Sequence, residues 1–362
     1  MSFFLAFWAF AALVILHEFG HFIAAKKTGM QVTRFSLFFP PALFKFKPKK
    51  SETSYEVGAL PFGGFVKITG MNPEEEIEDP EAVSRAYYNQ PVWKRIVVIS
   101  AGPAMNVLIA FLLIFVLYAF VGTAVGPSTK VEQVDKGAAA AGQIQPGDQI
   151  VAINGVSGGA QELVDELATS KCAGKKTDGC AATDPVEVTI ARDGKQMTFE
   201  TVPRYDAENE RMRLGVSFGV ETDTVAIPQA LEDTTVAMWE VTKATVSLPA
   251  RIIDPEKRKE ISSVVGGYES TRIAIDTDVE TTIKMIALIS LSLAIINMFP
   301  FLPLDGGHIL WALIEKARGG RPVPVSVLER ASFVGLALVL MLFAIGLTND
   351  IDRFQNGGFG PK

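Results

Sequence analysis

Four apolar stretches, each long enough to cross a lipid bilayer, constrain this chain more than any other feature. They cover approximately residues 2–25, 96–121, 283–308 and 327–347. A helix of about 20 apolar residues spans the hydrocarbon core of a membrane. Of 362 residues, 48% are hydrophobic and only 20% are charged, and the stretches contain the apolar excess over an ordinary soluble domain. The sequence therefore predicts a polytopic α-helical membrane protein with about four transmembrane helices.

The first stretch contains the sequence His17-Glu18-Phe19-Gly20-His21. Two histidines four residues apart project from the same face of a helix, where their imidazoles can hold one zinc ion. Glu18 lies beside them and points away from the axis between the rings and the metal, where it is placed to act on a metal-bound water as a general base rather than as a third ligand. Ionisable side chains at membrane depth are costly and indicate function. The alternative is a chance occurrence of the spacing.

The third stretch ends in a proline- and glycine-rich sequence that contains Asn297 and Asp305. The first and third stretches are predicted to run in the same direction, which brings the two histidines and Asp305 to a similar depth. Asp305 would complete a catalytic site of two histidines and one carboxylate. Asn297 could bind the substrate backbone or a developing oxyanion. Alternatively, Asp305 caps a broken helix and Asn297 satisfies a freed carbonyl.

The chain has three histidines, and the third, His308, is not expected to bind the metal. Asn106 lies in a patch of small residues in the second stretch, and we interpret this patch as a site of close helix packing rather than of catalysis.

Basic residues set the predicted orientation. The loop after the first stretch contains seven of them: Lys26, Lys27, Arg34, Lys45, Lys47, Lys49 and Lys50. By the positive-inside rule this loop is cytoplasmic and the N-terminus lies outside. The start of the chain has no basic region and no small-residue cleavage site follows, so we do not expect a signal peptide.

Between residues 33 and 71 the pattern changes to that of strands separated by proline and glycine. The aromatic run at 35–46 predicts a small sheet that enters the membrane beside the site, where irregular backbone must be covered by protein or line a wet cavity. An open strand edge there could hold a substrate in extended form. The alternative is a cytoplasmic hairpin that serves only as a connector.

Residues 126–204 have the composition of a β-rich domain. The turn Pro146-Gly147-Asp148 and the following Ile153-Asn154-Gly155 resemble a PDZ domain, whose open edge accepts an extended peptide or a chain terminus. Because this domain follows the second span, we predict that it is extracytoplasmic. Cys172 and Cys180 lie on an inserted loop, where they could form a disulfide or remain two thiols.

The predicted organisation has five parts. They are 1–125, a membrane core with the HExxH helix, a membrane-associated β-hairpin or sheet and the second span; 126–204, the PDZ-like domain; 205–282, a connecting region with an amphipathic helix; 283–350, a second membrane core; and 351–362, a disordered tail.

The motifs together resemble the site-2 protease family of intramembrane zinc metalloproteases, and are most similar to its bacterial regulator-of-sigma-E protease branch. They are HEFGH at 17–21, Gly-Pro-Ala-Met-Asn at 102–106, one PDZ-like insert, and N-x-x-P-x-x-P-L-D-G-G at 297–307. The resemblance implies zinc ligands His17, His21 and Asp305, a catalytic Glu18 and a substrate-contacting Asn297. The single PDZ-like domain, in place of a tandem pair, is a departure from the best-known members.

The resemblance also implies partners and a location. The expected substrates are single-span membrane proteins, such as anti-sigma factors already cut by another protease, and remnant signal peptides. The expected location is the bacterial inner membrane. A net charge of -6 argues against nucleic acid as a partner.

Two other functions compete with proteolysis. One is a non-proteolytic membrane scaffold that binds chain termini and holds a structural metal. The other is a metal transporter. Glu18 disfavours the scaffold, because a structural metal needs no general base beside it.

Overall fold

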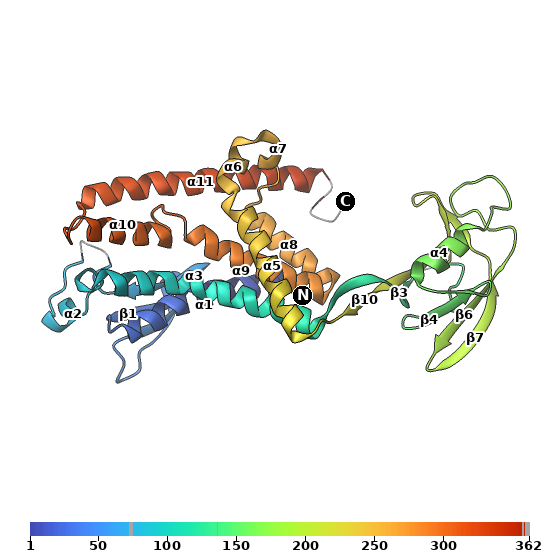
Figure 1. Cartoon of the computed structure of the whole chain (residues 1–362), viewed down its shortest axis with the longest axis horizontal. Coiled ribbons are helices and arrows are strands. Elements are labelled where there is room, and N and C mark those ends of the chain that lie inside the picture. The colour runs from blue at the N-terminus through green and yellow to red at the C-terminus, as the bar shows by residue number, and fades with distance from the viewer. Residues whose placement is uncertain (72–74, 136, 357, 359–362) are drawn as a thin grey trace. The chain divides into compact units, whose positions relative to one another are not determined.

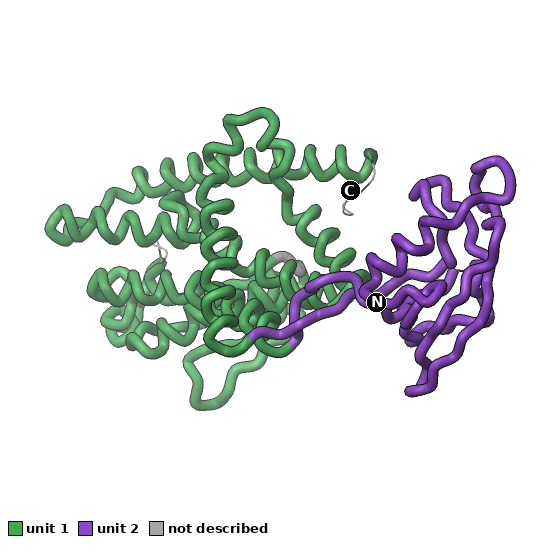
Figure 2. Tube along the Cα trace, turned by 45° about the vertical axis from the view of Figure 1, so that its right-hand side comes forward, with its two compact units in different colours: residues 1–120, 226–362 green, residues 121–225 purple. Residues whose placement is uncertain are grey.

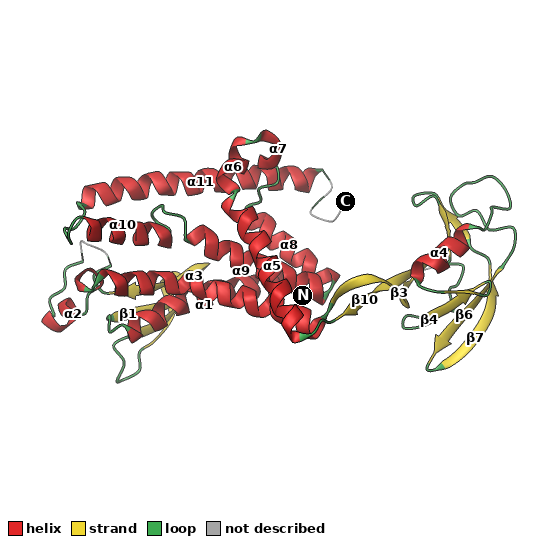
Figure 3. Cartoon of the chain, viewed as in Figure 1, coloured by secondary structure: helices red, strands yellow, loops and turns green. Residues whose placement is uncertain are grey.

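The computed structural model describes every residue except 72–74, 136, 357 and 359–362. The chain forms two compact units, one of residues 1–120 and 226–362 and the other of residues 121–225 (Figure 2). Helices make up most of the first unit, whereas strands dominate the second and form one hairpin in the first (Figure 3).

Four helices of the first unit are long and apolar enough to span a membrane, as predicted. They are α1 (Ser2–Lys27), α3 (Val92–Val116, continued by a π-helical turn at Leu117–Val121), α9 (Val279–Asn297) and α11 (Val325–Gln355). The shorter helical elements are α2 (Pro80–Ser84), the 3-10 turn Tyr87–Asn89, α5 (Ile227–Val246), α6 (Leu248–Ile253), α7 (Pro255–Arg258), α8 (Val264–Thr277) and α10 (Asp305–Ala317). Helix α3 packs against both α1 and α9 (Figure 1).

The long helices bury small and polar residues and expose large apolar ones. Gly20, Asn106 and Ser290 are buried between helices, whereas the side chains of Phe4 and Phe333 are 67% and 74% exposed. Lipid is as apolar as these side chains, so close contact between small residues holds membrane helices together better than apolar bulk does. This distribution is the one expected of helices surrounded by lipid.

The predicted sheet near residues 33–71 is one long antiparallel hairpin. Strand β1 (Val32–Phe46) pairs with β2 (Ser54–Ile68), which confirms the predicted β-hairpin or sheet. The register is irregular because two prolines interrupt β1, and proline and glycine interrupt β2. Leu43 and Phe44 of β1 are 74% and 63% exposed. Apolar side chains this exposed fit an apolar environment better than water.

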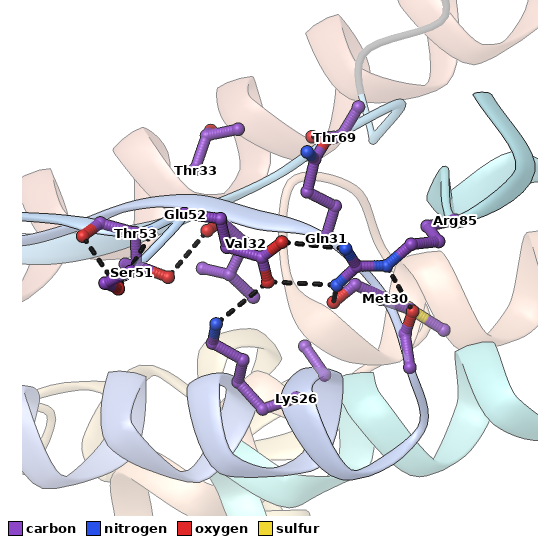
Figure 4. Close-up of polar contacts among 12 residues, drawn as sticks. Lys26, Met30, Gln31, Val32, Thr33, Ser51, Glu52, Thr53, Thr69 and Arg85 are labelled. Carbon is purple, nitrogen blue, oxygen red and sulfur yellow. Dashed lines mark hydrogen bonds and ion pairs between the residues drawn. The ribbon is translucent and has the colours of Figure 1, made fainter. Parts of the chain in front are cut away.

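A polar cluster fixes the loop between β1 and β2 to the helices (Figure 4). Glu52 accepts hydrogen bonds of 2.7 and 2.9 Å from the guanidinium of Arg85 and one of 2.9 Å from Nζ of Lys26. The hydroxyl of Thr53 donates to the carbonyl of Val32 at 2.7 Å. The cluster joins the end of α1, the hairpin loop and the segment after α2. It therefore holds the hairpin against α1, next to the histidines.

We expect Glu52→Gln to loosen the hairpin by about 1 kcal/mol, because a charge-assisted hydrogen bond is lost at a partly exposed site. Hydrogen bonds from Arg85, and then from Lys26, hold the pKa of Glu52 below its ordinary value. The stabilisation is therefore present above the unfolded pKa of about 4.3 and is lost as pH falls through the lower folded value.

Amide hydrogen exchange of the hairpin measures this effect. Exchange should be faster in the variant than in wild type at pH 7, and the difference should shrink below about pH 4. Glu256→Gln, at an exposed ion pair with Lys259, serves as the control. Equal exchange of wild type and Glu52→Gln at pH 7 would contradict the role of the cluster.

The second unit is a β-rich domain with one longer helix. Its main sheet has the strand order β10-β3-β4-β6-β7, with β5 paired to β4, and a separate ladder joins β8 and β9. The elements are β3 (Thr123–Val134), β4 (Gln149–Ile153), β5 (Val156–Ser157), α4 (Ala160–Ala168), β6 (Val186–Arg192), β7 (Lys195–Thr201), β8 (Arg204–Asp206), β9 (Arg211–Arg213) and β10 (Val216–Asp223). Ile150, Leu163, Val188 and Ile190 are among the buried residues of its core. Cys172 and Cys180 form a disulfide.

The structure corrects three predicted boundaries. The β-rich unit extends to residue 225, not 204, because β10 pairs with β3 and closes one side of the sheet. The connecting region is correspondingly shorter and is helical in α5 to α8. Residues 351–355, predicted to be a disordered tail, continue α11, while residues 357 and 359–362 of that tail lie outside the described part of the chain.

The predicted fold class is confirmed in its main terms. The structure combines four long apolar helices with a β-hairpin in the helical unit and a separate β-rich domain.

Candidate metal centre

Three ligand atoms from distant parts of the chain meet inside the helical unit. Nε2 of His17 and Nε2 of His21 are 3.3 Å apart. Oδ2 of Asp305 lies 3.3 Å from the first nitrogen and 3.4 Å from the second. Both histidines are buried. Among the described residues, these three form the only group of histidine, cysteine or acidic side chains that could hold a metal ion.

The dimensions of this triangle fit zinc. Two ligands at a tetrahedral angle, each about 2.0–2.1 Å from zinc, are separated by about 3.3 Å. Oδ2 of Asp305 is buried without a hydrogen-bond partner in the described structure, and leaving such an atom unsatisfied is costly. A cation held by the two imidazoles and this oxygen would remove that cost, and the three residues leave a fourth position open, as catalytic zinc sites do.

Helix α3 orients His21. Nδ1 of His21 lies 2.8 Å from the backbone carbonyl of Val98, so this nitrogen carries the hydrogen and Nε2 keeps its lone pair. A Cβ atom on Gly102 would lie 2.2 Å from Nε2 of His21, and one on Gly20 would lie 2.3 Å from the carbonyl oxygen of Ala101. Glycine at both positions is therefore required for α1 and α3 to approach closely enough at the site.

The loop between α9 and α10 positions Asp305. Asp305 is the first residue of α10, and the capping position belongs to Leu304, so the carboxylate does not serve as the helix cap. A Cβ on Gly306 would lie 2.1 Å from the carbonyl oxygen of Met298, and one on Gly307 would lie 2.4 Å from the nitrogen of Leu302. The two glycines let the loop fold tightly over the first turn of α10, which aims Asp305 at the histidines.

A cavity of about 350 Å³ opens beside the three ligand atoms. Its walls include the two histidines and Asp305, together with Glu18, Asn297 and His308. Strand β2 closes one side, and a Cβ on Gly64 would lie 3.4 Å from Cγ of Glu18. Every residue that the sequence singled out for the site is thus on the wall of one cavity.

The sequence did not identify Asn106 as part of this site. Asn106 is fully buried on α3, and Nδ2 of its carboxamide lies 3.3 Å from Nδ1 of His17. Its sequence context predicts a packing patch of small residues instead. A polar residue in the middle of an apolar span was the available signal, since such residues are expensive in a membrane unless they have a partner.

We expect Gly102→Ala to weaken zinc binding, because its new methyl group would overlap the imidazole of His21 and displace it. A 1 Å displacement of a ligand is enough to spoil tetrahedral geometry. The measurement is the zinc dissociation constant of the full chain in detergent, by competition with a chelator.

Gly267→Ala in α8 is the matched control, because the nearest atom to its Cβ would be Cζ of Phe10 at an ordinary contact distance of 3.8 Å. It should bind zinc as wild type does. Unchanged zinc affinity in Gly102→Ala would show that the contact with His21 does not position the ligand.

Comparison with known proteins identifies relatives along almost the whole chain. A model of Peptidase family M50 matches residues 5–342. Zinc metalloprotease Rip1 of Mycobacterium tuberculosis is 31% identical over 94% of this chain and 96% of its own. Regulator of sigma-W protease RasP of Bacillus subtilis is 25% identical over 95% of this chain and 96% of its own. Among solved structures, a PDZ domain of an SdrC-like protein from Listeria monocytogenes is 20% identical and covers 26% of this chain and 90% of that chain, with a TM-score of 0.21.

Proposed function

Because this chain belongs to Peptidase family M50, whose relatives here include zinc metalloproteases, we propose that it cleaves single-span membrane proteins inside the lipid bilayer. Family membership confirms the predicted resemblance, the predicted enzyme class and the predicted zinc cofactor. It also agrees with the four long apolar helices of a multi-pass membrane protein. The substrates, the roles of individual residues and the orientation in the membrane are proposals.

The observation that carries the proposal is the meeting of His17, His21 and Asp305 within 3.4 Å of one another. These three residues would hold the zinc ion. Zinc at such a site lowers the pKa of water and polarises a peptide carbonyl. The burial of both histidines in an apolar helix favours this role over a surface metal site, since charged groups inside a membrane need a partner.

Glu18 would be the general base and acid. Its carboxyl group lies on the wall of the same cavity as the three ligands, but it is not one of the three converging ligand groups. It would take the proton of the attacking water and pass it to the leaving amine of the cleaved bond. Asn297, at the end of α9, would donate a hydrogen bond from its side-chain amide to the substrate backbone or to the developing oxyanion.

Strand β2 would hold the substrate in extended form. Residues 63–66 of β2 line the cavity, and among the described strands β2 pairs only with β1. Residues 64–66 pair only with residues 35–37 of β1, so the other edge of this part of β2 has backbone groups available to a further strand. A substrate helix must unwind before its peptide bonds can reach a catalytic centre, and pairing with this edge would compensate for the lost helical hydrogen bonds.

The β-rich unit would bind a peptide or a chain terminus as PDZ-like domains do. Strand β10 is the last strand of its sheet. A cavity of about 330 Å³ lies between it and helix α4, with Val164 and Leu167 on one side and Ser217 and Phe218 on the other. An extended segment could pair with β10 and place side chains in this cavity.

The substrates we propose are anti-sigma factors already shortened by another protease, and remnant signal peptides. The name of the Bacillus subtilis relative, regulator of sigma-W protease, supports a role in sigma-factor regulation. The proposed location is the bacterial inner membrane. The basic residues after α1 support an orientation with that loop in the cytoplasm, and with the N-terminus and the β-rich unit outside.

The test is cleavage of a tagged single-span substrate by the zinc-loaded full chain in detergent. We expect Glu18→Gln to cleave at least about 100-fold more slowly than wild type while keeping its zinc, because only proton transfer is removed. Glu260→Gln, at an exposed side chain, is the control and should cleave at the wild-type rate. Equal cleavage by wild type and Glu18→Gln would contradict the role of Glu18.

Zinc content separates the enzyme from a scaffold. His21→Ala and Asp305→Ala should lose zinc and activity together, whereas His308→Ala, on the same cavity wall, should keep its zinc. Wild-type protein that binds zinc but cleaves no single-span substrate would favour the scaffold and contradict the proposed function.

A further inference from the structure

We propose that Asn106 is a positioning residue that orients His17 toward zinc by accepting a hydrogen bond from its Nδ1. The inference rests on the proposed zinc site but concerns a residue to which that proposal gives no role. Asn106 lies on α3, whereas the three ligands lie on α1 and α10. It would act on the metal only through the imidazole of His17.

Each of the two histidines needs a hydrogen-bond acceptor at Nδ1. When Nε2 of a histidine binds a metal, Nδ1 carries a hydrogen, and an acceptor for that hydrogen fixes the tautomer and the angle of the ring. His21 has such an acceptor in the backbone carbonyl of Val98, 2.8 Å from its Nδ1. For His17, the hydrogen-bonding group that the described structure places at Nδ1 is the carboxamide of Asn106, at 3.3 Å.

The carboxamide of Asn106 also contains an acceptor, the oxygen Oδ1. Oδ1 of Asn106 is buried and has no hydrogen-bond partner in the described structure, while Nδ2 faces His17. A half-turn of the amide exchanges these two atoms and changes the shape of the side chain very little. Oδ1 then accepts from the Nδ1 hydrogen of His17. The metal-bound tautomer of His17 therefore selects the amide orientation in which this oxygen is satisfied.

The backbone of Asn106 is held independently of its side chain. The hydroxyl of Ser290 on α9 donates to the carbonyl oxygen of Asn106 at 2.9 Å, and both residues are fully buried. The carboxamide is thus fixed at its base by α9 and aimed at α1. Because the apolar interior offers no water to replace a lost partner, removing the carboxamide would leave the hydrogen on Nδ1 of His17 unsatisfied whenever zinc is bound.

The test measures zinc affinity, which does not depend on cleavage. Asn106→Leu has a similar volume and no acceptor. We expect its zinc dissociation constant, by chelator competition in the full chain, to rise about 10- to 100-fold, the usual effect of losing an outer partner of a metal-bound histidine. The visible absorption of the Co²⁺-loaded protein should change as well, because it reports the geometry of the ligands.

Two variants separate hydrogen bonding from packing. Asn106→Asp keeps an acceptor at the same place and should bind zinc at least as tightly as wild type. Ser290→Ala removes the contact between α9 and the backbone of Asn106 but leaves the carboxamide, and should lower thermal stability without changing zinc affinity. If leucine prevents folding, Asn106→Ser, whose side chain is too short to reach His17, gives the same comparison.

Three results would overturn the inference. They are wild-type zinc affinity in Asn106→Leu, an equal loss of affinity in Asn106→Leu and Asn106→Asp, and an equal loss in Ser290→Ala. Failure of the proposed function is a different result, namely a wild-type protein that binds zinc and does not cleave. In that case the ranking of zinc affinities still decides whether Asn106 orients His17.

Discussion

A small group of polar side chains is buried among apolar helices, and the structure depends on giving these side chains partners. Two imidazoles and a carboxylate lie within 3.4 Å of one another in a unit whose helices expose large apolar residues. Such groups are expensive to bury unless they are paired or bind a metal. Among the described residues, these three form the one group of histidine, cysteine and acidic side chains that could hold a metal ion. We infer that the packing of the surrounding helices holds these three side chains together.

Close packing of the helices brings the three ligand side chains together. Helices α1 and α3 meet at Gly20 and Gly102, and the loop before α10 folds over Gly306 and Gly307. Each glycine lies where a Cβ would overlap a backbone atom or a ligand ring. The β1–β2 hairpin is then fixed beside the cavity by the polar cluster around Glu52. The same residues that hold the helices together therefore determine where the three ligand atoms lie and where strand β2 borders the cavity.

The sequence predicted the parts of this arrangement that follow local rules. The spacing of His17 and His21 is a property of one helix turn, and the direction of the spans placed Asp305 at the same depth. The structure brings these residues together. The long-range features could not be predicted from the sequence. The pairing of β10 with β3 joins residues about 90 positions apart, the hairpin register is irregular, and the contact of Asn106 with His17 depends on how α3 is rotated, which periodicity alone does not determine.

Zinc X-ray absorption of the full chain, purified with its own metal, tests the central claim most directly. Two imidazole nitrogens and oxygen ligands about 2.0–2.1 Å from one zinc ion per chain are the result this account predicts. The account would be contradicted by sulfur ligands at about 2.3 Å, by a zinc ion without imidazole ligands, or by a protein that retains no zinc.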